Sequence, residues 1–310
     1  MKIYSKSTIS IFTVLLVLLP VLVFGQAKVG TAAGQFLEIS PSPRAEGMSS
    51  AFIGVADDIY TIYYNPAGLA WQYQRQAAFA HTMMYADINM EWAAFSMPMF
   101  GGVLGISAMA LNAGEMDETD PKHPEGTGRT FSAGALSTGI TYSRALTDRF
   151  SIGINAKYIG EYLADVNAEG WGMDIGTYFK TAFRDIRLGM ILGNFGPDLE
   201  YLQQSYPLPM VFRFGGAGEI INGENHRITV DIEGSHPNDN LEKFQVGMEY
   251  AFREFAFIRG GYKIQYDNER FTGGAGVKIP IGGLIARVDY SFTYFEYVPG
   301  VHRFGLAVGF

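Results

Sequence analysis

The chain has 310 residues, a formal net charge of -8, no cysteine, 38 glycines and 14% aromatic residues. The lack of cysteine excludes disulfides and thiolate metal sites, and the acidic balance argues against a nucleic-acid partner, because phosphate binding needs clustered Lys and Arg. Only 17% of the residues are charged. Together with the abundant glycine and aromatic residues, this is typical of a membrane β-barrel rather than of a soluble enzyme.

The first 25 residues have the pattern of a secretory signal peptide. Lys2 and Lys6 precede an apolar run over residues 9–24. A membrane anchor is the alternative, but this run contains Pro20 and is short for a span of roughly twenty residues. We therefore expect a cleaved signal peptide, export, and a Gram-negative type outer-membrane location.

Residues 26–72 do not have a strand pattern. Ser42 before Pro43 predicts a helix start, and the helix is expected to end near Asp57. Apolar residues recur at helical spacing after this start: Ala45, Met48, Phe52 and Val55. The segment is too small to fold alone. We expect it to lie inside a barrel lumen as a plug or to close the periplasmic mouth.

The plug segment ends in a turn, because Asn65 stands before a proline and the residue before proline avoids the helical region. The turn is either a gate or the corner that leads into the first strand, and the corner is the favoured interpretation. The plug or gate candidates are Asn65, Pro66, Ala67 and Gly68.

From residue 73 to residue 310 the pattern has period two, which is typical of strands. In the last strand, apolar Phe304, Leu306 and Phe310 alternate with residues such as Arg303 and Gly305. Counting such segments gives about fourteen strands of roughly ten residues, the length that a tilted transmembrane strand needs. The predicted fold is all-β: a transmembrane antiparallel up-and-down β-barrel of about 14 strands with a small N-terminal helical plug segment.

Loop lengths support this topology. Every second connection is short, as expected at the periplasmic face, and the connections between them are longer and acidic, as expected outside. The expected outer loops are residues 112–130, 161–170, 194–207 and 234–242. The acidic run over residues 115–120 could bind a divalent cation, but a solvated loop is the favoured interpretation and no metal site is predicted.

Four runs in the N-terminal segment carry a family resemblance: residues 34–39, 44–48, 56–58 and 64–70, with sequences GQFLEI, RAEGM, ADD and YNPAGLA. Together they resemble the N-terminal signature of the PorV/PorQ family, which belongs to the FadL-like fourteen-stranded outer-membrane barrels. The resemblance implies a partner-binding component of type IX-like protein secretion or surface assembly, with a secretion translocon or secreted cargo as partner. The alternative that it implies is a FadL-like channel for uptake of hydrophobic small molecules. Beside these partners we expect outer-membrane lipid.

The predicted lumen face of the C-terminal half carries charges of both signs. Such charges usually pair with one another or with a plug, and a polar path or an anchor for a ligand headgroup is the functional alternative. The candidates are Arg213, Arg227, Asp231, Arg259, Arg287, Asp289 and Arg303.

Catalysis is not expected, and no cofactor is predicted. The five histidines are scattered, without metal-ligand spacing. A lipase in a barrel would need a serine–histidine pair with an orienting third group; Ser143 or Ser291 could be imagined, but no motif supports either.

Overall fold

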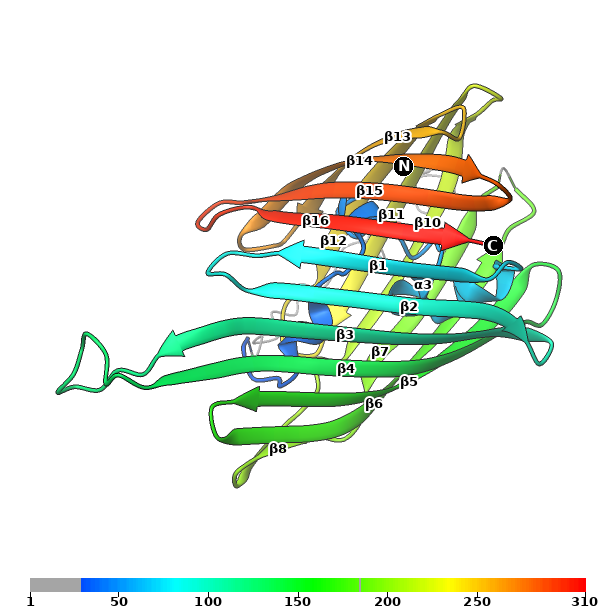
Figure 1. Ribbon diagram of the computed structural model, residues 1–310. Helices are drawn as coiled ribbons and strands as arrows, with labels where there is room; N and C mark the ends of the chain where they lie inside the picture. Colours follow the sequence, from blue (N-terminus) through cyan, green and yellow to red (C-terminus); the bar gives the residue numbers. More distant parts are fainter. Residues whose placement is uncertain (1–28, 184) are drawn as a thin grey trace, which may run out of the picture.

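The computed structural model describes residues 29–183 and 185–310, so the predicted signal peptide, residues 1–25, lies outside the described residues. In the described part, fourteen strands form a closed antiparallel barrel around a short helical segment (Figure 1). No helix in this part is long and apolar enough to cross a membrane. The predicted fourteen-stranded up-and-down barrel is confirmed. Its strands are β1 (Gln76–Met83), β2 (Asn89–Met99), β3 (Gly102–Asp117), β4 (Thr130–Ala145), β5 (Phe150–Leu163), β6 (Val166–Lys180), β7 (Arg187–Phe195), β10 (Val211–Asn222), β11 (His226–Pro237), β12 (Lys243–Phe252), β13 (Ala256–Ile264), β14 (Glu269–Ile281), β15 (Leu284–Phe295) and β16 (Val301–Gly309).

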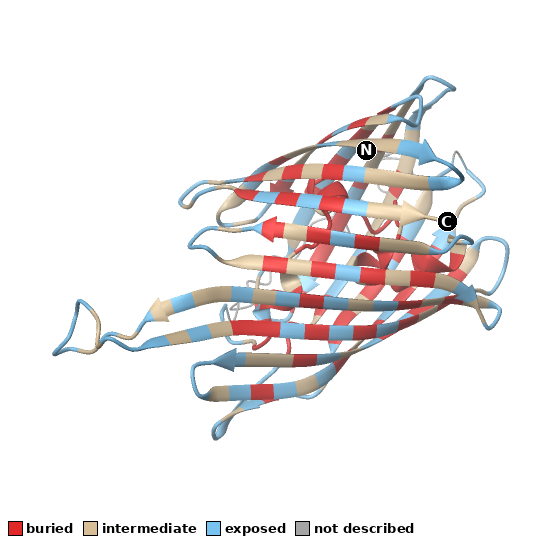
Figure 2. Cartoon of the chain, viewed as in Figure 1, coloured by how far each residue is buried: buried red, intermediate tan, exposed pale blue. Residues whose placement is uncertain are grey.

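The barrel closes because β1 pairs with β16 along its whole length, from Gln76 opposite Gly309 to Met83 opposite His302. Along strands such as β5 and β12, exposed and buried residues alternate (Figure 2). In β16, Phe304 and Leu306 are about half exposed, whereas Arg303, which precedes Phe304, is 5% exposed. The apolar face therefore points outward to lipid, and the polar face points into the lumen.

The two ends of the barrel differ. The inner end carries Phe310 and short turns such as residues 146–149 and 253–255. The outer end carries the two longest connections, residues 118–129 and 196–210, although its β5–β6 turn has only two residues (Figure 1). Because short turns and the C-terminus belong on the periplasmic side of such barrels, the inner end is assigned to the periplasm. The β3–β4 hairpin extends far beyond the other outer connections (Figure 1).

All four expected outer loops were wrong in part. Residues 112–130 and 234–242 begin as strand, since β3 continues to Asp117 and β11 to Pro237. Residues 161–170 were expected to be a long loop, but β5 and β6 continue through them to a two-residue turn at 164–165, because Leu163 pairs with Val166. Residues 194–207 were expected to be irregular, but they contain a small separate hairpin of β8 (Leu199–Tyr201) and β9 (Gln204–Tyr206). This hairpin buries Leu199 against the outer end of β6, beyond the point where β7 stops pairing with that strand.

Residues 29–72 lie inside the barrel, and we call them the plug (Figure 1). Its elements are the 3-10 helix η1 (Gln35–Glu38), α2 (Pro43–Glu46), α3 (Thr61–Tyr64) and the 3-10 helix η2 (Pro66–Trp71). As the sequence predicts, Ser42 caps α2 by accepting a hydrogen bond from Ala45 N at 3.2 Å, with Pro43 at the first helical position.

The predicted helix toward Asp57 was wrong in length, since α2 ends at Glu46. The φ angles of Ser49 and Ser50 are 59° and 62°, in the left-handed region that interrupts a right-handed helix. Contacts with the wall hold this turn, because Ser49 N donates to Thr272 Oγ1 at 2.9 Å. The apolar residues of the predicted stripe are nevertheless all buried, at 0–2% exposure: Ala45, Met48, Phe52 and Val55.

Glycines in the barrel wall let the plug reach the strand backbone. A Cβ at Gly247 would lie 2.3 Å from Met48 O, and one at Gly153 would lie 2.3 Å from the carbonyl carbon of Pro66. Atoms cannot approach so closely, so any larger residue there would force the plug or the strand to move. The plug is therefore fitted directly against the inside of the sheet.

Candidate functional site: the lumen of the barrel

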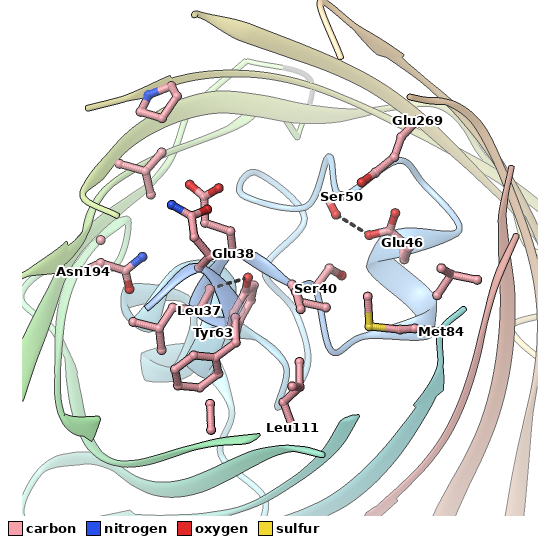
Figure 3. A pocket seen from close by; sticks show the side chains of 18 of the residues that line it. Leu37, Glu38, Ser40, Glu46, Ser50, Tyr63, Met84, Leu111, Asn194 and Glu269 are labelled. Atoms are coloured by element: carbon pink, nitrogen blue, oxygen red, sulfur yellow. Dashed lines mark hydrogen bonds between the residues drawn. The ribbon is translucent and has the colours of Figure 1, made fainter. Parts of the chain in front are cut away.

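The outer half of the lumen contains a cavity of about 720 Å³, which we call the outer cavity. It opens toward the longer connections, and the plug forms its floor through residues such as Leu37, Glu38 and Tyr63 (Figure 3). The cavity lies within the size range of small-molecule sites. The segment that forms this floor is tied to the outer end, because Ala33 N donates to Pro207 O at 2.9 Å and Gly34 N donates to Glu161 Oε2 at 3.1 Å.

Below the cavity, the plug is fixed to the wall by a buried network of charges. Arg44 in α2 donates from Nε and Nη2 to the two carboxylate oxygens of Glu249 in β12, at 3.0 and 2.9 Å. Arg44 also pairs with Asp57 and, at 2.8 Å, with Asp58. We call this network the charge hub; it is completed by Arg227, Arg259 and Arg287, which pair with Glu249, and by Asp289, which pairs with Arg259 and Arg287.

The charge hub is nearly neutral in total, and its central side chains are almost completely buried, with Arg44 at 2% and Glu249 at 1% exposure. Buried charges are tolerated only when they are paired and hydrogen-bonded. Burial alone would raise the pKa of Asp57, but the adjacent Arg44 guanidinium outweighs it and holds that pKa below its usual value. The hub therefore explains why charged residues occur in an otherwise apolar plug.

A second set of polar contacts, centred on Glu46, joins α2 to the strands β13 and β15, and we call it the Glu46 lock. Lys263 Nζ donates to Glu46 Oε1 at 2.7 Å and also pairs with Glu269. Thr293 Oγ1 donates to the same Glu46 oxygen at 3.1 Å. Burial by itself would raise the pKa of Glu46, but Lys263 and Arg303 hold it well below its usual value.

Two wall carboxylates bind the backbone of the plug. Asp231 Oδ2 accepts hydrogen bonds from Gly54 N and Val55 N, both at 3.0 Å. Glu233 Oε2 accepts from Phe52 N and Ile53 N, both at 3.2 Å. A loop that turns inside the lumen leaves backbone amides without helix or sheet partners, and these carboxylates satisfy them.

The plug and gate candidates lie at the inner end of the lumen. Asn65 adopts an extended backbone between α3 and η2, its Oδ1 accepts from Ala67 N at 3.2 Å, and its Nδ2 donates to Thr177 O at 3.1 Å. Ala67 O accepts from two wall hydroxyls, those of Ser143 at 3.2 Å and Ser151 at 2.8 Å. Pro66 and Gly68 are buried beside them. This corner holds the chain against β4, β5 and β6 before it enters β1.

Six of the seven charged lumen candidates make close contacts with the wall or the plug. Arg227, Arg259, Arg287 and Asp289 lie in the charge hub, Asp231 binds plug amides, and Arg303 donates to Ser40 O at 3.0 Å. Arg213 has a longer ion pair, because its closest carboxylate oxygen, Glu233 Oε1, is 4.0 Å away, and its guanidinium lies 5.7 Å from the ring centroid of Tyr63 in the plug.

Sequence reasoning missed the plug side of these contacts. Four charged plug residues were singled out only as part of the family signature and not as ion-pair partners: Arg44, Glu46, Asp57 and Asp58. The available signal was that each charge in a segment expected to be buried needs a partner of opposite sign. Glu38 and Lys243, which line the outer cavity, carry no comparable signal.

The barrel wall is continuous around β3. This strand pairs with β2 without a break from Gly102 to Asn112, and with β4 from Val103 to Asn112. The ladder then shifts by a bulge before Glu115, at the base of the protruding hairpin. Within the membrane-spanning part of β3, the hydrogen-bonded ladder leaves no lateral opening beside this strand. Among the described residues, no group of three His, Cys, Asp or Glu side chains is arranged to hold a metal ion.

A family model described as "Type IX secretion system protein PorV" matches residues 24–237, more than half of the chain. The chain belongs to the PorV family. This match covers the plug and the strands through β11. No curated protein matches the sequence significantly.

Solved structures with a similar fold extend over most of this PorV-family chain. The CymD monoaromatic hydrocarbon channel superposes with a TM-score of 0.60 at 10% identity, covering 87% of this chain and 96% of that one. The toluene transporter TodX of Pseudomonas putida has a TM-score of 0.57 at 11% identity, with 84% and 96% covered. A FadL homologue of Pseudomonas aeruginosa has a TM-score of 0.57 at 10% identity, with 88% and 98% covered. At such identities the likeness shows the fold, that of a FadL-like outer-membrane barrel.

Proposed function

We propose that this PorV-family barrel is a non-enzymatic component of type IX protein secretion that works by binding a partner protein at its outer end. The observation that carries the proposal is the family match through the plug and most of the barrel. The construction of the lumen supports it. The inner half is filled by paired and hydrogen-bonded plug residues, an arrangement suited to a rigid platform rather than to an open channel.

The β3–β4 hairpin offers a surface for such a partner. It stands clear of the other outer connections (Figure 1), and its tip carries the exposed Lys122 and Glu125. Bonds within the hairpin fix its shape: Arg129 pairs with Glu118 at 2.7 Å, and Asp120 and His123 bridge each other. A hairpin with its own ladder keeps its shape outside the membrane and loses little conformational freedom on binding.

The test is affinity purification of the tagged full chain from native outer membranes of the source bacterium. We expect a secretion component or secreted cargo to co-purify. Replacement of residues 119–128 by a two-residue turn should release that partner. The Asp148→Ala variant, in an inner turn where the side chain is 86% exposed, should retain it. If both variants keep the partner, the hairpin is rejected as the contact. If no partner co-purifies with the full chain, the secretion function is rejected.

The second candidate function is uptake of hydrophobic small molecules. The outer cavity favours it, as do two proteins of similar fold, a monoaromatic hydrocarbon channel and a toluene transporter. The continuous ladder around β3 and the filled inner lumen weigh against it. Cells that express the full chain should accumulate radiolabelled toluene no faster than cells without it. Accumulation that depends on the chain would instead support uptake.

A further inference from the structure

The outer part of β6 has a neighbouring strand on one side only. β5 pairs with β6 as far as the two-residue turn, where Leu163 is opposite Val166. On the other side, β7 pairs with β6 only as far as Phe195, which is opposite Met173. The chain then leaves the barrel ladder, and β8 and β9 form a separate two-stranded sheet (Figure 1). Residues 166–172 therefore lack a strand on the β7 side, and we call this stretch the β6 edge.

Main-chain groups of Asn167 and Glu169 point to the open side of the β6 edge. Successive residues of an antiparallel strand bond alternately to the strands on either side. At the inner end of β6, Thr181 N donates to Ile186 O, so odd-numbered residues bond toward β7. β6 pairs with β5 without a register shift, and the same alternation therefore reaches residue 167. Among the described residues, no hydrogen bond reaches the N–H or C=O groups of Asn167 and Glu169 from that side.

The outer part of the β6 edge is accessible, and both residues with free main-chain groups are exposed. The β8–β9 hairpin covers the lumen face of β6 rather than its edge, because a Cβ at Gly170 would lie 2.4 Å from Leu199 Cδ2. Backbone crosses the edge further in, at Gly196, where a Cβ would lie 2.4 Å from Trp171 O. The open stretch, residues 166–170, therefore lies beyond Trp171, on the aqueous side of the aromatic level. An extended peptide adds as a further strand to an edge of this kind.

The segments around the β6 edge carry only negative charges. Residues 158–172 and 195–210 contain no Lys or Arg. The nearest cation in sequence, Lys157, pairs in the lumen with Asp174 at 2.8 Å. The two segments contain five acids, which make no ion pair among the described residues: Glu161, Asp165, Glu169, Asp198 and Glu200. Opposite charges across neighbouring strands stabilise a sheet and like charges destabilise it, so the charge favours a basic strand at this edge.

A second copy of this chain fits the β6 edge poorly. Two equal edges would pair about a two-fold axis, so that the same segment of each copy faces the other. The five acids of one copy would then face the five acids of the other without a cation between them. The occupant that the edge favours is therefore a segment of a different protein, with basic residues where the edge has acidic ones.

We infer that the β6 edge is a docking surface to which an extended basic segment of a partner protein adds as a further antiparallel strand. Main-chain groups of the segment bond to the free N–H and C=O groups of Asn167 and Glu169. A Lys or Arg of the segment lies beside Glu169, and its alternate side chains face inward toward the buried Leu199, where apolar residues fit. The inference rests on the proposed function in that an outer partner exists, but the surface is separate from the β3–β4 hairpin.

The test is binding of a fluorescent Lys-Val-Lys-Val-Lys-Val-Lys peptide to the full chain in non-ionic detergent, measured by anisotropy. In antiparallel pairing, residues on the face of Glu169 direct their main-chain groups to the β6 edge, so the N–H groups of the Lys residues form the bonds. N-methylation of the main-chain nitrogens of Lys should therefore weaken binding at least about tenfold, whereas N-methylation of those of Val should leave it unchanged. Equal effects of the two methylations, or equal binding of the corresponding Glu-Val peptide, would overturn the inference.

A proline variant tests the main-chain bonds. Proline is tolerated on an edge strand where its missing N–H faces away from the ladder, so Asn167→Pro keeps the pairing with β5 and removes one free donor. We expect it to weaken binding of the Lys-Val peptide about tenfold, while the matched Asn167→Ala variant leaves binding unchanged.

A charge reversal tests the choice of partner. Glu169→Lys should weaken binding of the Lys-Val peptide at least about tenfold and allow the Glu-Val peptide to bind. This gain cannot arise from misfolding. Glu125→Lys, which makes the same charge change at an exposed position of the β3–β4 hairpin, is the matched control and should alter neither affinity. Unchanged affinities in both Asn167→Pro and Glu169→Lys would contradict the inference.

The outcomes also separate the two proposals. A dimer in detergent that Asn167→Pro dissociates would show that a second copy occupies the β6 edge, and would overturn the inference. Failure of the peptide to bind would reject the β6 edge and leave the secretion function to the purification from native membranes. Absence of a co-purifying partner would reject the secretion function, whereas binding of the peptide at the edge would stand.

Discussion

The inner and outer halves of the lumen are built from the same strands but use their charges in opposite ways. In the inner half, Glu249 is surrounded by four arginines, and Asp231 and Glu233 are engaged by plug amides. In the outer half, Arg213 lies 4.0 Å from Glu233 Oε1, and Lys243 beside the outer cavity makes no ion pair among the described residues. Charges that are closely paired hold structure, whereas a cation without an ion pair beside a cavity, such as Lys243, is free to change partners. The contrast separates what holds this barrel together from what it presents to the outside.

The largest expected effect is loss of the charge hub. Glu249→Gln leaves Arg44 and Arg259 buried without their shared anion and should lower the free energy of unfolding by about 3–5 kcal/mol. Thermal unfolding in detergent, followed by heat-dependent mobility on gels, measures this. Glu254→Gln is the control, because Glu254 is 51% exposed and its pair with Arg227 should contribute under about 1 kcal/mol. An equal loss of unfolding free energy in Glu249→Gln and Glu254→Gln would mean that the charge hub does not hold the plug.

Breaking the Glu46 lock should lower the free energy of unfolding less than breaking the charge hub, because Lys263 has two carboxylate partners. Glu46→Gln removes one partner of Lys263, but Lys263 keeps Glu269. We expect a loss of about 3 kcal/mol, at the lower end of the range for breaking a buried pair. The same unfolding assay applies. A loss as large as that of Glu249→Gln would show that Glu269 does not support Lys263.

The Glu46 lock should also weaken in acid. Lys263 and Arg303 overcome the effect of burial and lower the pKa of Glu46 from its ordinary 4.5. A carboxyl group with a lowered folded-state pKa contributes its full stability above the unfolded-state pKa and loses it as pH falls below that value. The stability difference between the natural chain and Glu46→Gln should therefore be constant from about pH 7 to 5 and shrink below about pH 4.5. A difference that stays constant down to about pH 3 would contradict the ion pair.

The smallest effects belong to the outer half. Lys243→Gln removes no ion pair found among the described residues, so it should change the free energy of unfolding by less than about 0.5 kcal/mol. The unfolding assay used for Glu249→Gln gives the comparison directly. Destabilisation by more than about 2 kcal/mol would mean that Lys243 is structural, and the division between the two halves would fail.

Much of the fold could be predicted because each barrel strand carries its own period-two signal. The alternation of Phe304 and Leu306 with polar or small residues is visible in the local sequence alone, and the same holds for the other strands. The plug was predictable only in part. Ser42 and Pro43 start a helix locally, but the turn at Ser49 and Ser50 is set by contacts with strands more than 200 residues away, such as that to Thr272.

The candidate site was predictable to the extent that strand alternation decides which charges face inward. Which of them would pair depends on neighbours across the barrel. Glu249 meets Arg44, a plug residue 205 positions earlier, and Arg213 meets Ser235 and Lys243 only through strand register. No local pattern contains that information, so the division into a locked half and an open half emerged only from the structure.

The absence of cysteine allows the most direct test of this division. Single-cysteine variants Lys243→Cys, in the outer cavity, and Ser143→Cys, buried against Ala67 at the inner end, can be treated on intact cells with a membrane-impermeant maleimide. We expect rapid labelling of Lys243→Cys and no labelling of Ser143→Cys until the chain is denatured. Labelling of Ser143→Cys from outside, at a rate like that of Lys243→Cys, would show an open lumen and contradict the account.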